Sequence, residues 1–340
     1  MDRPRLLLTI DVEEDMPGWE IQRPTRVDNA RGLPPLAELC RELGVRPTYL
    51  CSYPMVTEPE SAAVLRRLHA GGDCEIGTHL HPWNTPPFGG VPGRDGDEQS
   101  IPYYCYELGP ERFRAKLEVL HAAVAELTGE EPASFRAGRF GIDGALLGVL
   151  AECGYRTDSS VTPMVHHFED GGPDFRSAPQ RPYRPSRADA CARGDLPIVE
   201  VPVSVALSRR LPEPLRRAYA RIPPATRLRG LLSRDYLRLL DFAWLYPPRF
   251  DLELMRRAAR TLRDSGCPVL TVFLHSSELV PGAASLVRTE ADLAAGTARL
   301  RGILEYCIGT LDAVPATLDE VGRELEPLLE PGGELALAAR

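Results

Sequence analysis

The sequence lacks long apolar runs. Its 340 residues contain no apolar stretch of about 18 residues or more, so we expect no membrane span. The first apolar stretch, "LLLTI", is too short for the hydrophobic region of a signal peptide, which favours a cytoplasmic protein. The chain also lacks a net positive charge, since 48 acidic residues outnumber 40 basic ones. The formal net charge of −8 repels phosphate backbones and argues against nucleic-acid binding.

Paired cysteines are missing too. The chain has eight cysteines, and none of them forms a CxxC motif or a tight cluster. This spacing excludes a cysteine-ligated zinc site and a disulfide scaffold as leading interpretations. Reduced thiols in the cytoplasm are the simplest account.

What the chain does contain is an alternation of short apolar runs and helical patterns. Strand-like runs such as "RLLLTID", "CEIGTHLH" and "CPVLTVFLHSS" alternate with amphipathic stretches, and Thr289 is placed to cap a late helix. About seven such units predict an α/β fold with parallel strands. Functional sites form where parallel strands end. Five polar residues end such runs: Asp11, His79, Arg136, Asp158 and His275.

Two stretches interrupt this rhythm. We expect one domain over residues 1–325, with insertions at about 84–110 and about 206–250 and a C-terminal tail at 326–340. Nine arginines lie between Arg209 and Arg238, in a pattern that suggests two helices. Such a stretch is usually a solvated helical face, but it could also clamp an anionic group of a substrate.

The acidic motif "TIDVEED" follows the first strand directly. In an extended chain the side chains of Asp11 and Glu13 point to one face, and that of Glu14 points to the other. Two carboxylates in one cleft could supply a base and a metal ligand. A solvated turn that caps the next element is the alternative.

His79 and His81 share a strand face for the same reason. Two histidines and one carboxylate leave a fourth position for water, which is the pattern of a catalytic zinc site. Two histidines satisfied by hydrogen bonds at a strand end are the alternative.

Other polar and aromatic residues offer less specific signals. Buried arginines such as Arg136 and Arg139 need carboxylate partners, and the acids near residue 11 are candidates. Trp83 and Trp19, and also Trp244 or Tyr246, could stack on the apolar face of a sugar. Core packing is the alternative for each aromatic residue.

Five motifs in this order carry a resemblance: "TIDVEED", "EIGTHLHP", "SFRAGRFGID", "YRTDSSV" and "VFLHSSEL". Together they resemble the polysaccharide deacetylase family, the NodB-homology group, and its sub-branch with an HLHPWNTPP-like motif. The resemblance spans roughly residues 5–160 and 195–322. It implies a distorted (β/α)7 TIM-like barrel, here with a helical Arg-rich insertion. It also implies a divalent metal, with zinc first and cobalt or nickel as alternatives.

The resemblance implies roles for individual residues. Asp11 matches the family's base, and Arg136 matches the arginine that steadies it. His275 matches the catalytic acid, Asp158 looks like its supporting carboxylate, and His79 matches the first metal histidine. Trp83, Trp19 and Arg139 are weaker candidates for substrate binding.

Two positions depart from the family pattern. Val12 replaces the usual second carboxylate, so the metal-ligand role passes to Glu13, with Glu14 as the alternative. The second histidine usually comes four residues after the first, where this chain has Trp83. His81 precedes a proline, as the usual second histidine does, and we assign it that role.

The expected function is hydrolysis of an acetyl group on an N-acetylated sugar or glycan, which could carry an anionic group. One alternative is hydrolysis of a non-sugar amide C–N bond on the same scaffold. The other is a non-catalytic carbohydrate-binding relative, which the altered motifs keep open.

Overall fold

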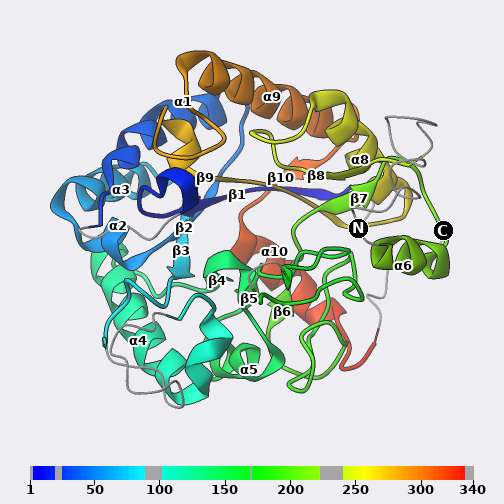
Figure 1. Ribbon diagram of the computed structural model, residues 1–340, viewed down its shortest axis with the longest axis horizontal. Helices are drawn as coiled ribbons and strands as arrows, with labels where there is room; N and C mark the ends of the chain where they lie inside the picture. The colour runs from blue at the N-terminus through cyan, green and yellow to red at the C-terminus, as the bar shows by residue number, and fades with distance from the viewer. Residues whose placement is uncertain (1–2, 20–24, 89–101, 169–170, 223–239, 334–340) are drawn as a thin grey trace.

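The computed structural model of the chain describes residues 3–19, 25–88, 102–168, 171–222 and 240–333. A parallel sheet runs through the molecule, in the order β9-β1-β2-β3-β4-β5-β6 (Figure 1). The bounds of these strands are β1 (Arg5–Val12), β2 (Thr48–Cys51), β3 (Glu75–Leu80), β4 (Ser134–Ala137), β5 (Thr157–Asp158), β6 (Val199–Glu200) and β9 (Val269–His275). This curled parallel sheet confirms the predicted distorted (β/α)7 barrel.

Three short strands complete the sheet structure. β10 (Val314–Pro315) pairs with the start of β1. β7 (Val205–Leu207) and β8 (Phe242–Trp244) form a separate antiparallel pair. The amide of Phe273 in β9 donates to the carbonyl oxygen of Leu245, so the end of this pair lies beside β9.

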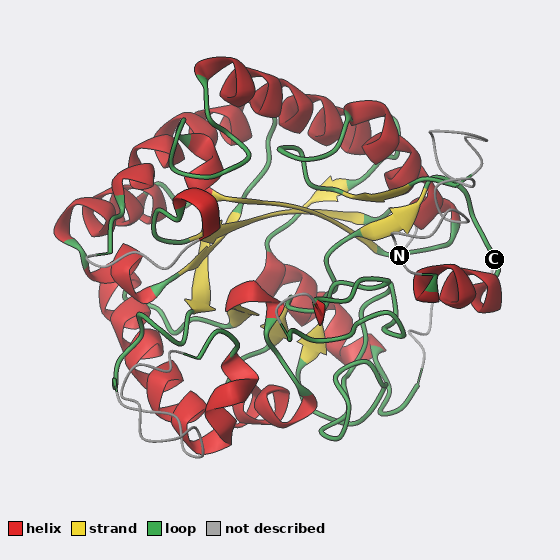
Figure 2. Cartoon of the chain, in the orientation of Figure 1, coloured by secondary structure: helices red, strands yellow, loops and turns green. Residues whose placement is uncertain are grey.

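Helices cover the outside of the sheet (Figure 2). They are α1 (Leu33–Glu42), α2 (Tyr53–Thr57), α3 (Pro59–Ala70), α4 (Gly109–Thr128), α5 (Gly144–Glu152), α6 (Glu213–Arg221), α8 (Leu252–Asp264), α9 (Glu290–Gly309) and α10 (Leu318–Leu325). Short 3-10 turns lie between them: η1 (Pro17–Trp19), η2 (Asp28–Gly32), η3 (Cys105–Leu108), η4 (Gly138–Phe140), η6 (Ser276–Leu279) and η7 (Glu326–Leu328). Thr289 caps α9 as predicted, because its side chain accepts a hydrogen bond from the amide of Asp292.

Strand alternation decides what each side of β1 contacts. Leu6, Leu8 and Val12 belong to the large core between sheet and helices, whereas Leu7 packs in a second cluster with residues of β2, β6 and β9. Odd-numbered residues of β1 therefore face the inside of the barrel. Asp11 continues this inward-facing series toward the carboxyl end of the strand.

Some predicted features fall where the structure gives partial information. The first helix of the Arg-rich insertion is α6, but the second, expected near 225–240, lies almost entirely outside the described residues. Residues 89–101 of the first insertion are also outside them. All eight cysteines are free. Within the described ranges, no helix has both the length and the apolarity to cross a bilayer.

Gly77 allows β3 to pack closely between β2 and β4. A Cβ atom at this position would lie 2.6 Å from the carbonyl oxygen of Ser134 and 2.8 Å from Cδ2 of Leu50. We expect Gly77→Ala to lower the free energy of unfolding by about 1–3 kcal/mol, measured by urea denaturation, because the added carbon overpacks the sheet.

Gly296→Ala in α9 is the matched control. An added Cβ at Gly296 meets nothing within 4 Å, and alanine is the better helix former. This variant should be at least as stable as the parent. Equal midpoints for Gly77→Ala and the parent would contradict the close packing of β3.

Candidate active site

Three strand ends deliver side chains to one cavity of about 460 Å³. β1 contributes Asp11 and is followed by Glu13, β3 contributes His79 and is followed by His81, and β9 contributes His275. These residues line the cavity and are all buried. The structure thus brings together five of the residues that the sequence predicts for the site.

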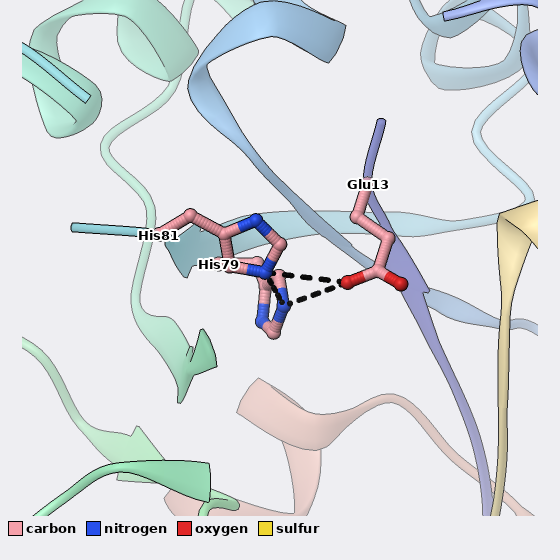
Figure 3. Close-up of side chains that lie close together, drawn as sticks. All are labelled: Glu13, His79 and His81. Carbon is pink, nitrogen blue, oxygen red and sulfur yellow. Dashed lines mark hydrogen bonds and ion pairs between the residues drawn. The ribbon is translucent and has the colours of Figure 1, made fainter. Parts of the chain in front are cut away.

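Glu13, His79 and His81 form a compact cluster (Figure 3). Oε2 of Glu13 lies 3.4 Å from Nε2 of His79 and 3.2 Å from Nε2 of His81. The two Nε2 atoms are 3.0 Å apart. All three side chains thus offer ligand atoms within 4.8 Å of one another.

The outer ring nitrogens of both histidines are anchored. Nδ1 of His79 donates to the carbonyl oxygen of Arg136 (3.0 Å), and Nδ1 of His81 donates to Oε1 of Glu14 (2.9 Å). This leaves both Nε2 atoms directed at Glu13, as in histidines that bind metal. Oε1 of Glu13 is buried and has no hydrogen-bond partner among the residues that the structure describes. The donor set therefore fits a divalent metal ion.

The electrostatics of the cluster also suit a cation. Burial would lower the pKa of His81, but Glu14 and Glu13 outweigh it and raise that pKa to about 10. Burial would raise the pKa of Glu13, yet the charge of His275 and hydrogen bonds from His79 and His81 hold it well below its usual range. The same carboxylates that retain a proton on His81 would attract a metal ion in its place.

Glu14 holds His81 from behind. Besides His81, its carboxylate accepts hydrogen bonds from Nε1 of Trp83 (2.8 Å) and from Oγ of Ser52 (3.2 Å). The structure therefore places Glu13, and not Glu14, beside both Nε2 atoms, as strand alternation predicts. Gly138 also matters here, because a Cβ atom on it would lie 2.3 Å from Cδ2 of His81.

Arg136 is completely buried and fixes Asp11. Its Nη1 donates to Oδ1 of Asp11 at 2.6 Å. Nη2 donates to Oγ1 of Thr9 and to Oγ of Ser159, both at 2.9 Å, and Nε donates to the carbonyl oxygen of Ser159 at 2.7 Å. This is the carboxylate partner that a buried arginine needs.

His275 faces Asp11 from β9. Its Nε2 lies 3.9 Å from Oδ2 of Asp11, and its Nδ1 lies 3.3 Å from Oε2 of Glu278 in η6. The hydroxyl of Tyr246 donates to Glu278. Burial would lower the pKa of His275, but the charges of Glu278 and Glu13 raise it to about 9. A histidine that stays protonated at neutral pH can act as a general acid.

The predicted partner of His275 was wrong. The carboxylate beside its Nδ1 is Glu278, not Asp158. Asp158 instead accepts hydrogen bonds from the amide and the hydroxyl of Ser160 and pairs in register with Glu200 of β6. Burial, followed by the charge of Asp158, raises the pKa of Glu200 well above its usual range. Asp158 therefore belongs to a buried carboxyl pair outside the cavity lining.

Aromatic rings form much of the cavity wall. Trp244 and Tyr246 line it, as does Arg139. Trp83 does not line it. This residue is 6% exposed and stacks on His81 with ring centroids 4.2 Å apart, so the idea that it binds substrate is corrected. The side chain of Trp19 lies outside the described part of the chain.

Two residues of the site escaped the sequence analysis. Glu278 stands three residues after His275, and the two form a capping box, so the spacing could have revealed it. His167 also lines the cavity, although its place in a polar loop of the sequence predicts no chemical role.

The Arg-rich insertion contributes to a different cavity. Arg209, Arg210 and Arg216 line a space of about 340 Å³ together with Cys267 and other residues. Cys267 precedes β9, whereas His275 ends it. Among the described residues, the two cavities have no lining residue in common. None of these three arginines lines the cavity of Asp11.

Comparisons with known proteins place the fold. No family model and no curated protein matches the chain. A protein from Mycobacterium smegmatis named as a polysaccharide deacetylase shares 18% identity, with a TM-score of 0.57, over 100% of this chain and 96% of that one. A protein from Parabacteroides distasonis named as a glycoside hydrolase/deacetylase shares 14% identity, with a TM-score of 0.63, over 97% and 73%.

An allantoinase is similar as well, at 12% identity and a TM-score of 0.52, over 95% of this chain and 90% of that one. At such identities the similarity establishes the fold. The chain therefore has the fold of proteins named as polysaccharide deacetylases, in agreement with the resemblance of its five ordered motifs.

Proposed function

We propose that this protein is a metal-dependent hydrolase that removes the acetyl group from an N-acetylated sugar or glycan. One observation carries the proposal: a Glu-His-His cluster shares a cavity with a base held by an arginine and a histidine held by a carboxylate. The fold of proteins named as deacetylases supports it.

Glu13, His79 and His81 would hold the metal ion. Two imidazoles and one carboxylate, with room for a further ligand, favour zinc, and cobalt or nickel would suit the same donors. When bound, such an ion supplies Lewis-acid chemistry, which acidifies water and polarises an acyl oxygen.

Asp11 acts as the general base. Arg136 holds Oδ1, while Oδ2 faces the cavity and His275. Oδ2 accepts a proton from the attacking water while the oxygen of that water bonds to the acyl carbon. Arg136 is fixed by Thr9 and Ser159, so the orientation of the base does not depend on substrate.

His275 acts as the general acid. Glu278 sets its ring and favours the protonated form. Its Nε2 donates a proton to the leaving nitrogen as the C–N bond breaks, which releases the free amine and acetate. Asp11 and His275 lie on the neighbouring strands β1 and β9 and line the same cavity. The base and the acid therefore face one substrate.

The fold of an allantoinase favours a second candidate, which is hydrolysis of a small non-sugar amide by the same residues. Acetate release from free and oligomeric N-acetylglucosamine separates the two. Turnover of ureide or simple amide substrates, without turnover of any acetylated sugar, would replace the leading proposal with the second.

Metal binding should depend on Glu13 more than on Glu14. We expect Glu14→Gln to weaken zinc binding by about 10–100-fold, because it disturbs the orientation of His81. Glu13→Ala removes a ligand and should weaken binding further. Competition with a chromogenic chelator measures both, with Glu60→Gln on the surface of α3 as the control. Equal affinity in Glu13→Ala and the parent would remove Glu13 from the metal site.

Asp11→Asn should lower kcat by about 10²–10⁴-fold, the usual share of general acid–base catalysis. The zinc content of the purified variant should stay at the parent level, because Asp11 lies outside the metal cluster. Acetate release and elemental analysis test the two parts. Retained turnover in this variant would mean that another group is the base.

Glu278→Gln should alter the pH dependence of kcat/KM. His275 must be protonated to act as the acid, so activity is present below its pKa and is lost as the pH rises through it. Glu278 raises that pKa, and its loss should move the alkaline limb to lower pH by about 1–3 units. Glu290→Gln at the exposed start of α9 is the control. An unmoved alkaline limb would show that His275 is not the acid.

A further inference from the structure

The wall of the active-site cavity carries two arginines. Arg139 follows β4, and Arg249 follows β8. Among the described residues that line the cavity, the acids are Asp11 and Glu13, and both belong to the reacting group. A neutral acetylated sugar would not need two guanidinium groups beside it. We propose that the site selects N-acetylated substrates that also carry a carboxylate or phosphate group, an inference that rests on the proposed function.

Arg249 offers an accessible cation at this wall. Its side chain is exposed and lies over the ring of Phe250, with 5.9 Å from the guanidinium carbon to the ring centroid. In the described part of the chain, no carboxylate lies within ion-pair distance of it. A guanidinium group binds the planar oxygens of carboxylate and phosphate through paired hydrogen bonds.

The guanidinium group of Arg139 lies over two aromatic rings. Its guanidinium carbon lies 5.5 Å from the ring centroid of Tyr103 and 5.4 Å from that of Tyr104. Such contacts fix the plane of the guanidinium group by cation–π attraction. The side chain is therefore positioned against the cavity before a ligand arrives.

The backbone at this point is unusual. Arg139 and Phe140 both have left-handed conformations, with φ of 53° and 59°. Residues other than glycine rarely adopt them, and they cluster at functional sites. Here the two successive left-handed residues both line the cavity, the first with a cation and the second with a ring.

Aromatic rings line the same cavity as the two arginines. Phe140 and Trp244 lie with ring centroids 5.9 Å apart, and both line the cavity. Their faces suit the apolar side of a pyranose ring. An acetylated aminosugar with one anionic substituent matches this cavity in three ways. Its ring suits the aromatic side chains, its anion suits the arginines, and its acetyl group suits the reacting residues.

Three sugars test the proposal: neutral N-acetylglucosamine, its 6-phosphate, and N-acetylmuramic acid, which carries a carboxylate. In the parent protein, at least one anionic sugar should exceed the neutral one in kcat/KM by about tenfold, mainly through a lower KM. The anionic sugar with the higher kcat/KM shows which anion the site prefers. Arg249→Ala should bring this ratio close to one, and Arg249→Lys should restore part of it.

Arg66→Ala is the matched control, because Arg66 is also exposed and has no carboxylate partner in the described part of the chain, but lies on α3 away from the cavity. It should keep the parent ratio. Equal kcat/KM for neutral and anionic sugars in the parent, or an unchanged ratio in Arg249→Ala, would overturn the proposal while deacetylation stands.

Calorimetric binding of the same sugars separates this inference from the proposed function. If no sugar is hydrolysed, the deacetylase proposal fails. Tighter binding of an anionic sugar than of the neutral one, lost in Arg249→Ala, would still support anion recognition. Equal binding of all three sugars would contradict anion recognition.

Discussion

The buried ion pair between Arg136 and Asp11 is the constraint on which the site is built. Breaking such a pair by removing one partner leaves a buried charge and costs about 3–5 kcal/mol. Here the guanidinium group donates hydrogen bonds to Asp11 and Thr9 of β1 and to Ser159, which lies just after β5. The side chain of Arg136 on β4 thus joins β1 to the residues just after β5. Of these residues Asp11 lines the cavity, so the network fixes one of the side chains that face it.

Charge balance between the acidic residues and the histidines explains the orientation of His79 and His81. Glu13 and Glu14 bring two negative charges to a buried place, where unpaired charge is costly. His81 lies between them, anchored on one by Nδ1 and facing the other with Nε2. His79 uses a backbone carbonyl for the same anchoring. A cation can therefore replace a proton at the inner nitrogens while the outer hydrogen bonds stay in place.

Strand alternation and the rule that sites gather at strand ends were enough to predict the cluster of Glu13, His79 and His81. The role of Asp158 beside His275 came from the family resemblance, and the strand-end rule could not test it, because ending a strand does not say which side a carboxyl group faces. The strand-end rule also missed Glu278, which lies in a short turn after β9, where alternation no longer applies. The role of Trp83 was wrong for a related reason. A ring two residues after His81 stacks on it, and sequence alone does not separate such a support from an exposed platform.

The two departures from the family pattern are compatible with a single site. Val12 faces the core between sheet and helices, so a carboxylate at that position would point away from the cavity. The next residue, Glu13, points inward instead. His81 follows His79 by two residues and keeps the same face, so both meet Glu13 at comparable distances. A carboxylate one position later and a histidine two positions earlier therefore converge, and the altered spacing is no evidence of a decayed site.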